Sequence, residues 1–309
     1  MSEYLKNSNV GSKGLSWAEK ISNPAQVGGI ETAVLDNGPG RGARIAWVNT
    51  GSGLRYKVVL SRAMDIADAF YQQHSLSWLS HGGIQLPQPF SDRGAGWLRG
   101  FGGGLLVTCG LTHIGPPESD DFGERGLHGQ ISHVPAEIES IIQPNPVAGQ
   151  LEMSITGKMR QSQALGPQLE FRRSISSILG EASITIKDEV RNCGNLPVPL
   201  MLLYHCNFGW PLVDEGTAIL WKGPWQAREE AAKRRIFTEG NDFRHCAPPL
   251  DAHAGTGEEA CFIDAAPDLS GYCHCGLHNP GLELMFSLRF KKEELPWLTN
   301  WQHWGRKDM

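Results

Sequence analysis

The strongest candidate for proton transfer is a histidine at the end of an apolar run. Residues 198–205 (VPLMLLYH) predict a strand that ends in His205, and Asn207 lies two positions further on. Because residues two apart at a strand end face the same side, this pair suits an acid held by a neighbouring amide beside a bound ligand. Asp214 and Glu215 follow within reach of the same rim. The alternative interpretation of His205 is a satisfied core histidine.

A second pair of histidines lies in residues 126–137 (GLHGQISHVPAE). His128 stands beside glycine backbone, and an imidazole can gain or lose its proton near neutral pH. The spacing of His128, His133 and Glu137 also resembles a set of metal ligands. A regular strand would point the two histidines to opposite faces unless a bulge intervened. Proton transfer and metal binding therefore both stay open for this segment.

Glycines surround Arg99 in residues 96–104 (GWLRGFGGG). A backbone this rich in glycine can turn sharply and approach a ligand closely. The guanidinium of Arg99 keeps its charge, and its fork of donors suits hydroxyl groups or a carboxylate. The alternative is a glycine-rich loop whose arginine pairs with a surface acid.

The composition excludes several classes of protein. The chain has 309 residues, of which 40% are hydrophobic and 20% charged, and its formal net charge is −5; these values are typical of a soluble globular protein. No stretch approaches the ~20 apolar residues of a membrane-spanning helix. No dense Lys/Arg cluster indicates nucleic acid as a partner. The polar N-terminus lacks the apolar run of a secretory signal, which predicts a cytoplasmic protein.

Sequence motifs for common cofactors are missing as well. The chain has no G-x-S-x-G elbow, Walker loop or dinucleotide fingerprint, so we expect no NAD, ATP or other cofactor. The seven cysteines include no C-x-x-C pair, which argues against both a disulfide framework and a zinc ribbon. Cys273 and Cys275 flank His274. A reduced pair on a strand is the simpler interpretation of these residues than a metal site.

The elements that must carry these residues are predicted to be strands. Residues 43–50 and 54–60 predict a hairpin around Gly51, Ser52 and Gly53. Further apolar or alternating runs of strand length occur at 104–110, 151–157, 168–178, 182–191, 198–205, 217–221, 260–264 and 282–290.

One segment alone, residues 225–235 (WQAREEAAKRR), predicts a helix. Many short strands separated by Gly/Pro turns indicate an all-β sandwich or barrel. We find no low-complexity linker and no repeat, so we expect one domain over residues 26–309, preceded by a loosely held arm over residues 1–25.

Four segments carry a resemblance to a known family: SRAMDIADAFY (61–71), GWLRGFGGGLLVTCGLTHIG (96–115), GLHGQISHVPAE (126–137) and LLYHCNFGWPL (202–212). They resemble the DUF4432 family of the galactose mutarotase-like (aldose 1-epimerase-like) superfamily, over roughly residues 25–305. The resemblance implies a β-supersandwich, a large twisted antiparallel sandwich that binds carbohydrate in a cleft on one concave sheet.

The resemblance also implies roles for particular residues. His128 matches the histidine of an L-H-G string that contacts the sugar, and His205 resembles a second histidine, which protonates the ring oxygen. Arg99 is the candidate for an arginine that contacts hydroxyl groups. Arg62 and Asp65 belong to the family's own pattern, and we expect them near the cleft.

The implied chemistry explains these residue types. Mutarotation opens a cyclic hemiacetal: a base takes the anomeric hydroxyl proton while an acid donates to the ring oxygen, and the aldehyde then rotates and recloses. A carboxylate and an imidazole can do this without a metal or cofactor. Trp97 and Trp210 flank the ligand segments and could stack on the sugar or fill the core.

The catalytic base is where this sequence departs from the family. Relatives carry a late Glu in a G-[LI]-E-P string, shortly after a segment like LPWLTNWQHWG (295–305). Here no such string precedes the last residue, Met309. Either the chain is truncated at its C-terminus or the base is lost. In the second case Glu137, Asp214 or Glu215 would substitute, or the protein would bind sugar without turning it over.

The leading hypothesis is therefore a carbohydrate-binding isomerase of the aldose 1-epimerase type, which interconverts sugar anomers or epimers. The alternatives are a non-catalytic carbohydrate-binding protein on the same scaffold and a metal-dependent sugar isomerase that uses His128, His133 and Glu137. The expected partner is a small-molecule sugar or sugar derivative. Exposed edge strands make a homodimer a reasonable expectation.

Overall fold

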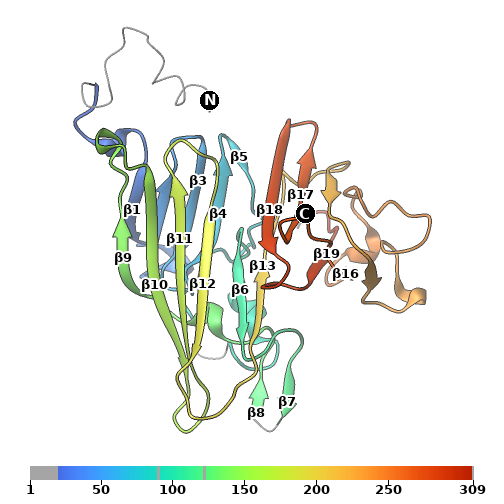
Figure 1. The fold of residues 1–309 in the computed structure, drawn as a ribbon. Coiled ribbons are helices and arrows are strands. Elements are labelled where there is room, and N and C mark those ends of the chain that lie inside the picture. The colour runs from blue at the N-terminus through green and yellow to red at the C-terminus, as the bar shows by residue number, and fades with distance from the viewer. Residues whose placement is uncertain (1–19, 89–90, 121–122, 308–309) are drawn as a thin grey trace. The chain divides into compact units, whose positions relative to one another are not determined.

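The computed structural model describes residues 20–88, 91–120 and 123–307 (Figure 1). It divides into two compact units, Met1–Asn207 and Phe208–Met309. Both units consist of antiparallel sheets joined by turns, so the predicted all-β antiparallel class is confirmed. No helix in these described ranges is long and apolar enough to span a bilayer. The single domain over 26–309 stays a prediction, and residues 1–19 of the predicted arm lie outside the described ranges.

The first unit begins with a five-stranded sheet in sequence order. Its central hairpin is the predicted one, because β2 and β3 pair antiparallel around the Gly51–Gly53 turn. Alternate side chains of β3, namely Leu54, Tyr56 and Val58, are buried, as expected for a half-buried sheet. The strands are β1 (Gly29–Val34), β2 (Arg44–Asn49), β3 (Leu54–Val59), β4 (Asp65–Tyr71) and β5 (His74–Ser75).

A four-stranded sheet faces the first one (Figure 1). Strand β11 buries its odd-numbered residues, among them Phe171, Arg173 and Ile175, while its even-numbered residues are exposed or half-buried. The hydroxyl groups of Tyr56 on β3 and Ser177 on β11 are hydrogen-bonded at 2.9 Å, which joins the two sheets across the core. The order is β12 (Thr185–Asn192), β11 (Gln168–Ile178), β10 (Glu152–Ser162) and β9 (Glu137–Ile142).

A separate pair of strands, β6 (Val107–Leu111) and β13 (Met201–His205), carries the candidate site. Val107 lies opposite His205, and Thr108 lies opposite Tyr204. Because side chains alternate along a strand, His205 and Tyr204 point to opposite faces of this pair. A short hairpin of β7 (Glu118–Asp120) and β8 (Gly123–Arg125) follows β6 along the chain.

The second unit contains two three-stranded sheets. Cys273 and Cys275 lie on β17 as free thiols, which agrees with the predicted strand-borne pair. One sheet has the order β14 (Ala218–Leu220), β17 (Tyr272–Asn279) and β18 (Leu284–Lys291); the other has the order β15 (Trp225–Ala227), β16 (Glu259–Ile263) and β19 (Leu298–Gln302).

The predicted helix over residues 225–235 is wrong. The segment forms strand β15 and then a single 3-10 turn, Ala231–Lys233. The buried carboxylate of Glu259 accepts hydrogen bonds from the backbone N–H groups of Arg235, Ile236 and Phe237, at 2.5, 2.9 and 3.3 Å. These tertiary bonds replace the local ones of a helix and override helix propensity.

The remaining helical segments with described bounds are 3-10 turns of three to five residues: Pro24–Gln26, Gly38–Gly40, Gly96–Gly100, Ile131–His133, Pro146–Ala148 and Asp251–His253.

Candidate active site

One face of the β6–β13 pair forms an aromatic and apolar floor. Trp97, Val107 and Cys109 are buried together, and Phe101 and Leu203 pack against them. The strand register places His205 on this same face, opposite Val107, at the very end of β13. The floor therefore presents one imidazole at its edge.

The second imidazole is held by an unusual piece of backbone. His128 adopts a left-handed conformation with φ of 57°, which a side chain other than glycine adopts at some cost. Its N–H donates to the carbonyl of Gly115 at 3.0 Å, and its carbonyl accepts from Gly110 at 3.0 Å. Gly129 follows because a Cβ there would lie 2.3 Å from the oxygen of Gly110. The surrounding backbone thus fixes the direction of this side chain.

A further hydrogen bond selects the form of the His128 ring. The backbone N–H of Gly115 donates to Nδ1 of His128 at 3.2 Å. Since Nδ1 is the acceptor, the neutral ring carries its proton on Nε2. The hydrogen bond from Gly115 therefore sets the tautomer of the neutral His128 ring.

The two imidazoles meet over Trp97 and Phe101. The ring centroids of His128 and His205 lie 5.9 Å apart, with the rings nearly perpendicular at 79°. Trp97 contacts His128 edge-on at 4.9 Å and lies 6.3 Å from His205. Phe101 stacks on Trp97 at 4.4 Å and meets His205 at 5.7 Å. The structure thus joins segments 96–104, 126–137 and 202–212 at one place.

Trp97 itself is part of the core. Its side chain is 2% exposed, and its indole N–H donates to Oγ of Ser132 at 3.2 Å. Of the two roles expected for Trp97, this geometry favours packing beneath the histidines. The sequence motifs did not indicate Phe101 as a residue of the site. The glycines around it could have done so, because they let the chain turn and place this ring beside His205.

Arg99 lies in the 3-10 turn Gly96–Gly100 and is exposed. It makes no hydrogen bond or ion pair with any residue of the described ranges, so the alternative of pairing with a surface acid is not seen. Its guanidinium is available to a ligand from the same turn that supplies Trp97.

Asn207 holds the end of β13 in place. Its side-chain amide donates to the carbonyl oxygens of Gly104 at 2.9 Å and His205 at 3.1 Å. Its own carbonyl oxygen accepts from the backbone N–H of Trp78 at 3.0 Å. With both amide hydrogens given to backbone, Asn207 holds the chain at His205, and contact of Asn207 with a substrate stays a prediction.

Arg62 ties two site segments together. This buried guanidinium donates to the carbonyl oxygens of Gly100 at 2.6 Å and Ser132 at 3.1 Å. Burial lowers the pKa of Arg62, and the nearby carboxylate of Asp65 opposes that effect. Arg62 therefore acts as a clamp between the glycine-rich turn and the segment that carries His128.

Asp65 belongs to a buried ionic network on the opposite face of the pair. Its Oδ1 accepts from the backbone N–H and the hydroxyl group of Thr108, at 2.9 and 2.6 Å. Arg173, which is 0% exposed, donates to Thr108 at 2.7 Å and binds Asp188 through two nitrogens. The Tyr204 hydroxyl donates to Asp188 at 2.6 Å. Desolvation raises the pKa of Asp65 to about 6, although Arg173 and Thr108 oppose that shift.

The residues of the metal hypothesis are not brought together. His133 is buried, and desolvation lowers its pKa to about 3, so its ring is neutral. Glu137 is exposed on β9 and pairs with Arg160 at 2.9 Å and Lys158 at 3.8 Å. Within the described ranges, no group of three His, Cys, Asp or Glu residues could hold a metal ion.

Trp210 and Asp214 belong to the second unit. The Trp210 side chain is 68% exposed, and the turn that follows it is anchored by Asn279, whose amide donates to the carbonyl of Pro211 at 3.0 Å. The carboxylate of Asp214 accepts from the backbone N–H of Glu215 at 2.9 Å. Their contact with a ligand stays a prediction.

The comparisons with known proteins agree on the fold. A structure from Klebsiella pneumoniae subsp. pneumoniae MGH 78578, provisionally named an aldose 1-epimerase, is 23% identical over 89% of this chain and 71% of its own, with a TM-score of 0.76. The Slr1438 protein from Synechocystis sp. PCC 6803 is 14% identical over 84% and 81%, with a TM-score of 0.58. Galactose 1-epimerase from Lactobacillus acidophilus NCFM is 10% identical over 81% and 77%, with a TM-score of 0.52.

These likenesses show a galactose mutarotase-like sandwich. No curated protein matches the sequence. The model of a family described as a domain of unknown function, DUF4432, matches residues 40–309 and confirms the resemblance seen in the sequence motifs. The chain therefore belongs to the DUF4432 family.

Proposed function

We propose that the protein binds a sugar beside His128 and His205 and interconverts its anomers by acid–base ring opening. The observation that carries the proposal is the meeting of these two imidazoles, 5.9 Å apart, above a buried aromatic floor. Two neighbouring groups that can donate hydrogen bonds suit the ring oxygen and hydroxyl groups of a sugar. The provisional name of the Klebsiella protein and the name of the Lactobacillus enzyme support this choice of chemistry.

His205 is the proposed general acid. As an imidazolium it donates a proton to the ring oxygen, the C1–O5 bond breaks, and a base removes the proton of the anomeric hydroxyl, so that an open-chain aldehyde forms. Rotation about C1–C2 and the reverse proton transfers close the opposite anomer. The residue is suited to this because the backbone contact from Asn207 fixes its strand end.

His128 is the proposed contact to a sugar hydroxyl. In its neutral form the ring carries its proton on Nε2, because Nδ1 accepts from the backbone N–H of Gly115. A neutral imidazole in this role orients the ring without competing for the proton that His205 transfers. Arg99, exposed on the neighbouring turn, is the proposed second contact.

A non-catalytic carbohydrate-binding protein is the second candidate. The observation in its favour concerns Glu137, which was one of the expected substitutes for the catalytic base. Arg160 and Lys158 engage this carboxylate on the outer face of β9. Binding of sugar to the two histidines without turnover would fit that arrangement.

Polarimetry of freshly dissolved α-anomers of hexoses, pentoses and sugar acids tests the proposal. We expect the wild-type protein to speed equilibration of at least one sugar and His205→Ala to lower that rate by about 100-fold or more, the usual contribution of a general acid. His128→Ala should mainly raise KM. His274→Ala, which removes an exposed histidine of the second unit, is the matched control and should change nothing.

Two outcomes would contradict the proposed enzymatic activity. Sugar binding with no acceleration across the whole panel would favour the binding protein. Turnover that is unchanged in His205→Ala would remove His205 from the mechanism, even if His128→Ala were impaired.

A further inference from the structure

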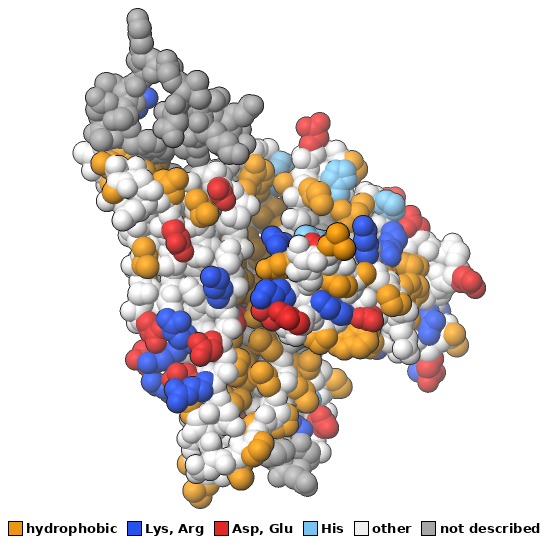
Figure 2. All heavy atoms as spheres, in the orientation of Figure 1, with side chains coloured by type: hydrophobic (Ala, Val, Ile, Leu, Met, Phe, Trp, Pro, Cys, Tyr) orange, Lys and Arg blue, Asp and Glu red, His pale blue; other side chains and the backbone are white. Residues whose placement is uncertain are grey.

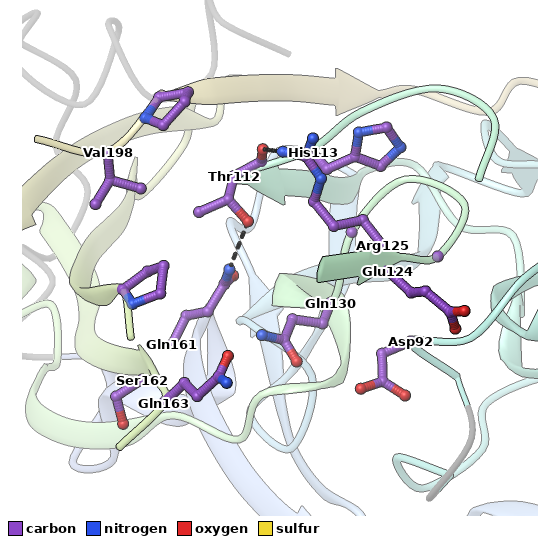
Figure 3. Close-up of a pocket in the computed structure, with 14 residues that line it drawn as sticks. Asp92, Thr112, His113, Glu124, Arg125, Gln130, Gln161, Ser162, Gln163 and Val198 are labelled. Atoms are coloured by element: carbon purple, nitrogen blue, oxygen red, sulfur yellow. Dashed lines mark hydrogen bonds between the residues drawn. The ribbon is translucent and has the colours of Figure 1, made fainter. Parts of the chain in front are cut away.

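A cavity lies at the end of the β6–β13 pair that is farther from His205 (Figure 3). Its volume is about 340 Å³, which falls within the range of about 300–1,000 Å³ for small-molecule sites. Thr112 follows the last residue of β6, and Val198 and Pro199 precede β13. His205 pairs with Val107, so roughly five residues at about 3.3 Å each separate the two places.

The floor of this cavity is fixed by hydrogen bonds. Gln161 on β10 is 5% exposed. Its side-chain oxygen accepts from the backbone N–H of Leu111 at 3.2 Å, and its amide nitrogen donates to the hydroxyl group of Thr112 at 3.3 Å. Arg125 donates to the carbonyl oxygen of Thr112 at 3.0 Å. A buried polar floor of this kind needs no rearrangement before a ligand binds.

The rim of the cavity carries polar side chains that can still form hydrogen bonds with a ligand. Figure 3 shows Gln130, Gln163 and Asp92 pointing toward the open middle of the pocket, with Glu124 next to Asp92. None of these four side chains makes a hydrogen bond or ion pair with another residue in the described ranges. They come from three separate segments of the chain, so the fold is what gathers them.

We propose that this cavity is a second binding site, for a small polyhydroxylated molecule that carries no negative charge. Amides and carboxylates around a polar floor match hydroxyl groups, which donate and accept in turn. The two rim carboxylates disfavour an anionic ligand, and the guanidinium of Arg125, which lines the cavity, donates to Thr112 and lies 3.9 Å from Glu118. The cavity shares backbone with the proposed active site, because Gly126 and Gly129 line it on either side of Leu127 and His128, but His128 and His205 are not among its lining residues.

Titration of the ¹⁵N-labelled full chain, followed by amide chemical shifts, tests the proposal. The probes are myo-inositol, D-galactose, D-glucosamine and D-glucuronate; myo-inositol has no anomeric carbon and so cannot be a substrate for mutarotation. We expect myo-inositol to shift amides around Gln161 and Thr112. The double variant D92N/Q163A should weaken that binding by at least 10-fold, whereas Glu31→Gln, on exposed β1, and His205→Ala should leave it unchanged.

Several results would overturn the proposal. They are the absence of any shift at these amides, shifts confined to the surroundings of His128 and His205, binding that is equal in the double variant and the wild type, and tighter binding of D-glucuronate than of D-galactose. Loss of sugar turnover in His205→Ala with inositol binding retained would separate this site from the proposed active site. The double variant changes side chains at the rim, so the dispersion of its remaining amide signals checks that it is folded.

Discussion

One face of the β6–β13 pair carries the rings of Trp97, Phe101 and His205, whereas the opposite face carries Thr108 and Tyr204 and the ions that they contact. On the ring face, both histidines are half-buried. On the ionic face, Arg173 has no exposure and is saturated by carboxylates, a hydroxyl group and a carbonyl.

The β6–β13 pair therefore contributes to stability through its ionic face and carries the candidate site on its ring face. Tyr204 and His205 are neighbours in the sequence, yet the first locks a buried carboxylate and the second ends the strand at the candidate site. Figure 2 shows acidic and basic side chains gathered on the visible surface of the first unit. Glu137 and Arg160, which pair at 2.9 Å, are likewise exposed. Buried pairing on the ionic face constrains the same two strands that carry the ring face.

Arg173→Met should have the largest effect on the free energy of unfolding, because it leaves the buried carboxylates of Asp188 and Asp65 without their partner. Removing one member of a buried ion pair costs about 3–5 kcal/mol. Urea unfolding measures the change. The matched control is Arg172→Met, which removes an exposed neighbour on β11 that pairs with Glu139 and should lose far less. Equal losses in the two variants would refute the special role of the ionic face.

Asp65→Asn should change how stability depends on pH. The native pKa of Asp65 is about 6 and its ordinary value is 3.8, so the folded state binds more protons than the unfolded state between these values. The stability that this group contributes is therefore lost as pH rises from 4 to 6, by about 2–3 kcal/mol relative to the variant. The depressed pKa of His133 gives an opposite trend, but in both proteins, so it cancels in the difference. Parallel pH profiles of the two proteins would contradict the prediction.

Tyr204→Phe should separate the two faces. It removes one hydrogen bond to the charged Asp188, which costs about 1.5–2 kcal/mol of unfolding free energy. If the faces act independently, sugar turnover stays within about twofold of the wild type, far from the loss expected for His205→Ala. A fall in kcat as large as in His205→Ala, with KM unchanged, would show instead that the ionic face sets the position of the acid.

Much of the sheet structure could be predicted because its signal is local. Residues 168–178 alternate apolar and polar side chains, and β11 has those same bounds. The turn at Gly51–Gly53 marks the β2–β3 hairpin in the same way. The helix over 225–235 could not be rejected from its own residues, since the carboxylate that prevents it, Glu259, lies 24 residues beyond Arg235.

The candidate site was predictable only in part, for a related reason. The family motifs indicated His128 and His205, and the structure brings both together. The roles of Arg62 and Asn207 as clamps could not be seen, because each depends on backbone carbonyl groups supplied by distant turns. Arg173 shares the face of Phe171 and Ile175, so its direction follows from the alternation. Its partners Thr108 and Asp188, however, lie on other strands and could not be predicted from its neighbours.

Glu137→Gln should have the smallest effect and tests the outer surface against the ring face. Glu137 is exposed, and the ion pairs that it makes with Arg160 and Lys158 are of the surface kind, which often contribute nothing measurable to stability. We therefore expect unchanged urea unfolding and unchanged sugar turnover by polarimetry. A strong loss of turnover with stability intact would make Glu137 the base after all, and would require the β9 edge to approach the sugar. The arrangement of its partners argues against that role. Arg160 and Lys158 neutralise the Glu137 carboxylate on the outer face of the sheet. A proton acceptor there would not act on the same sugar as the two imidazoles.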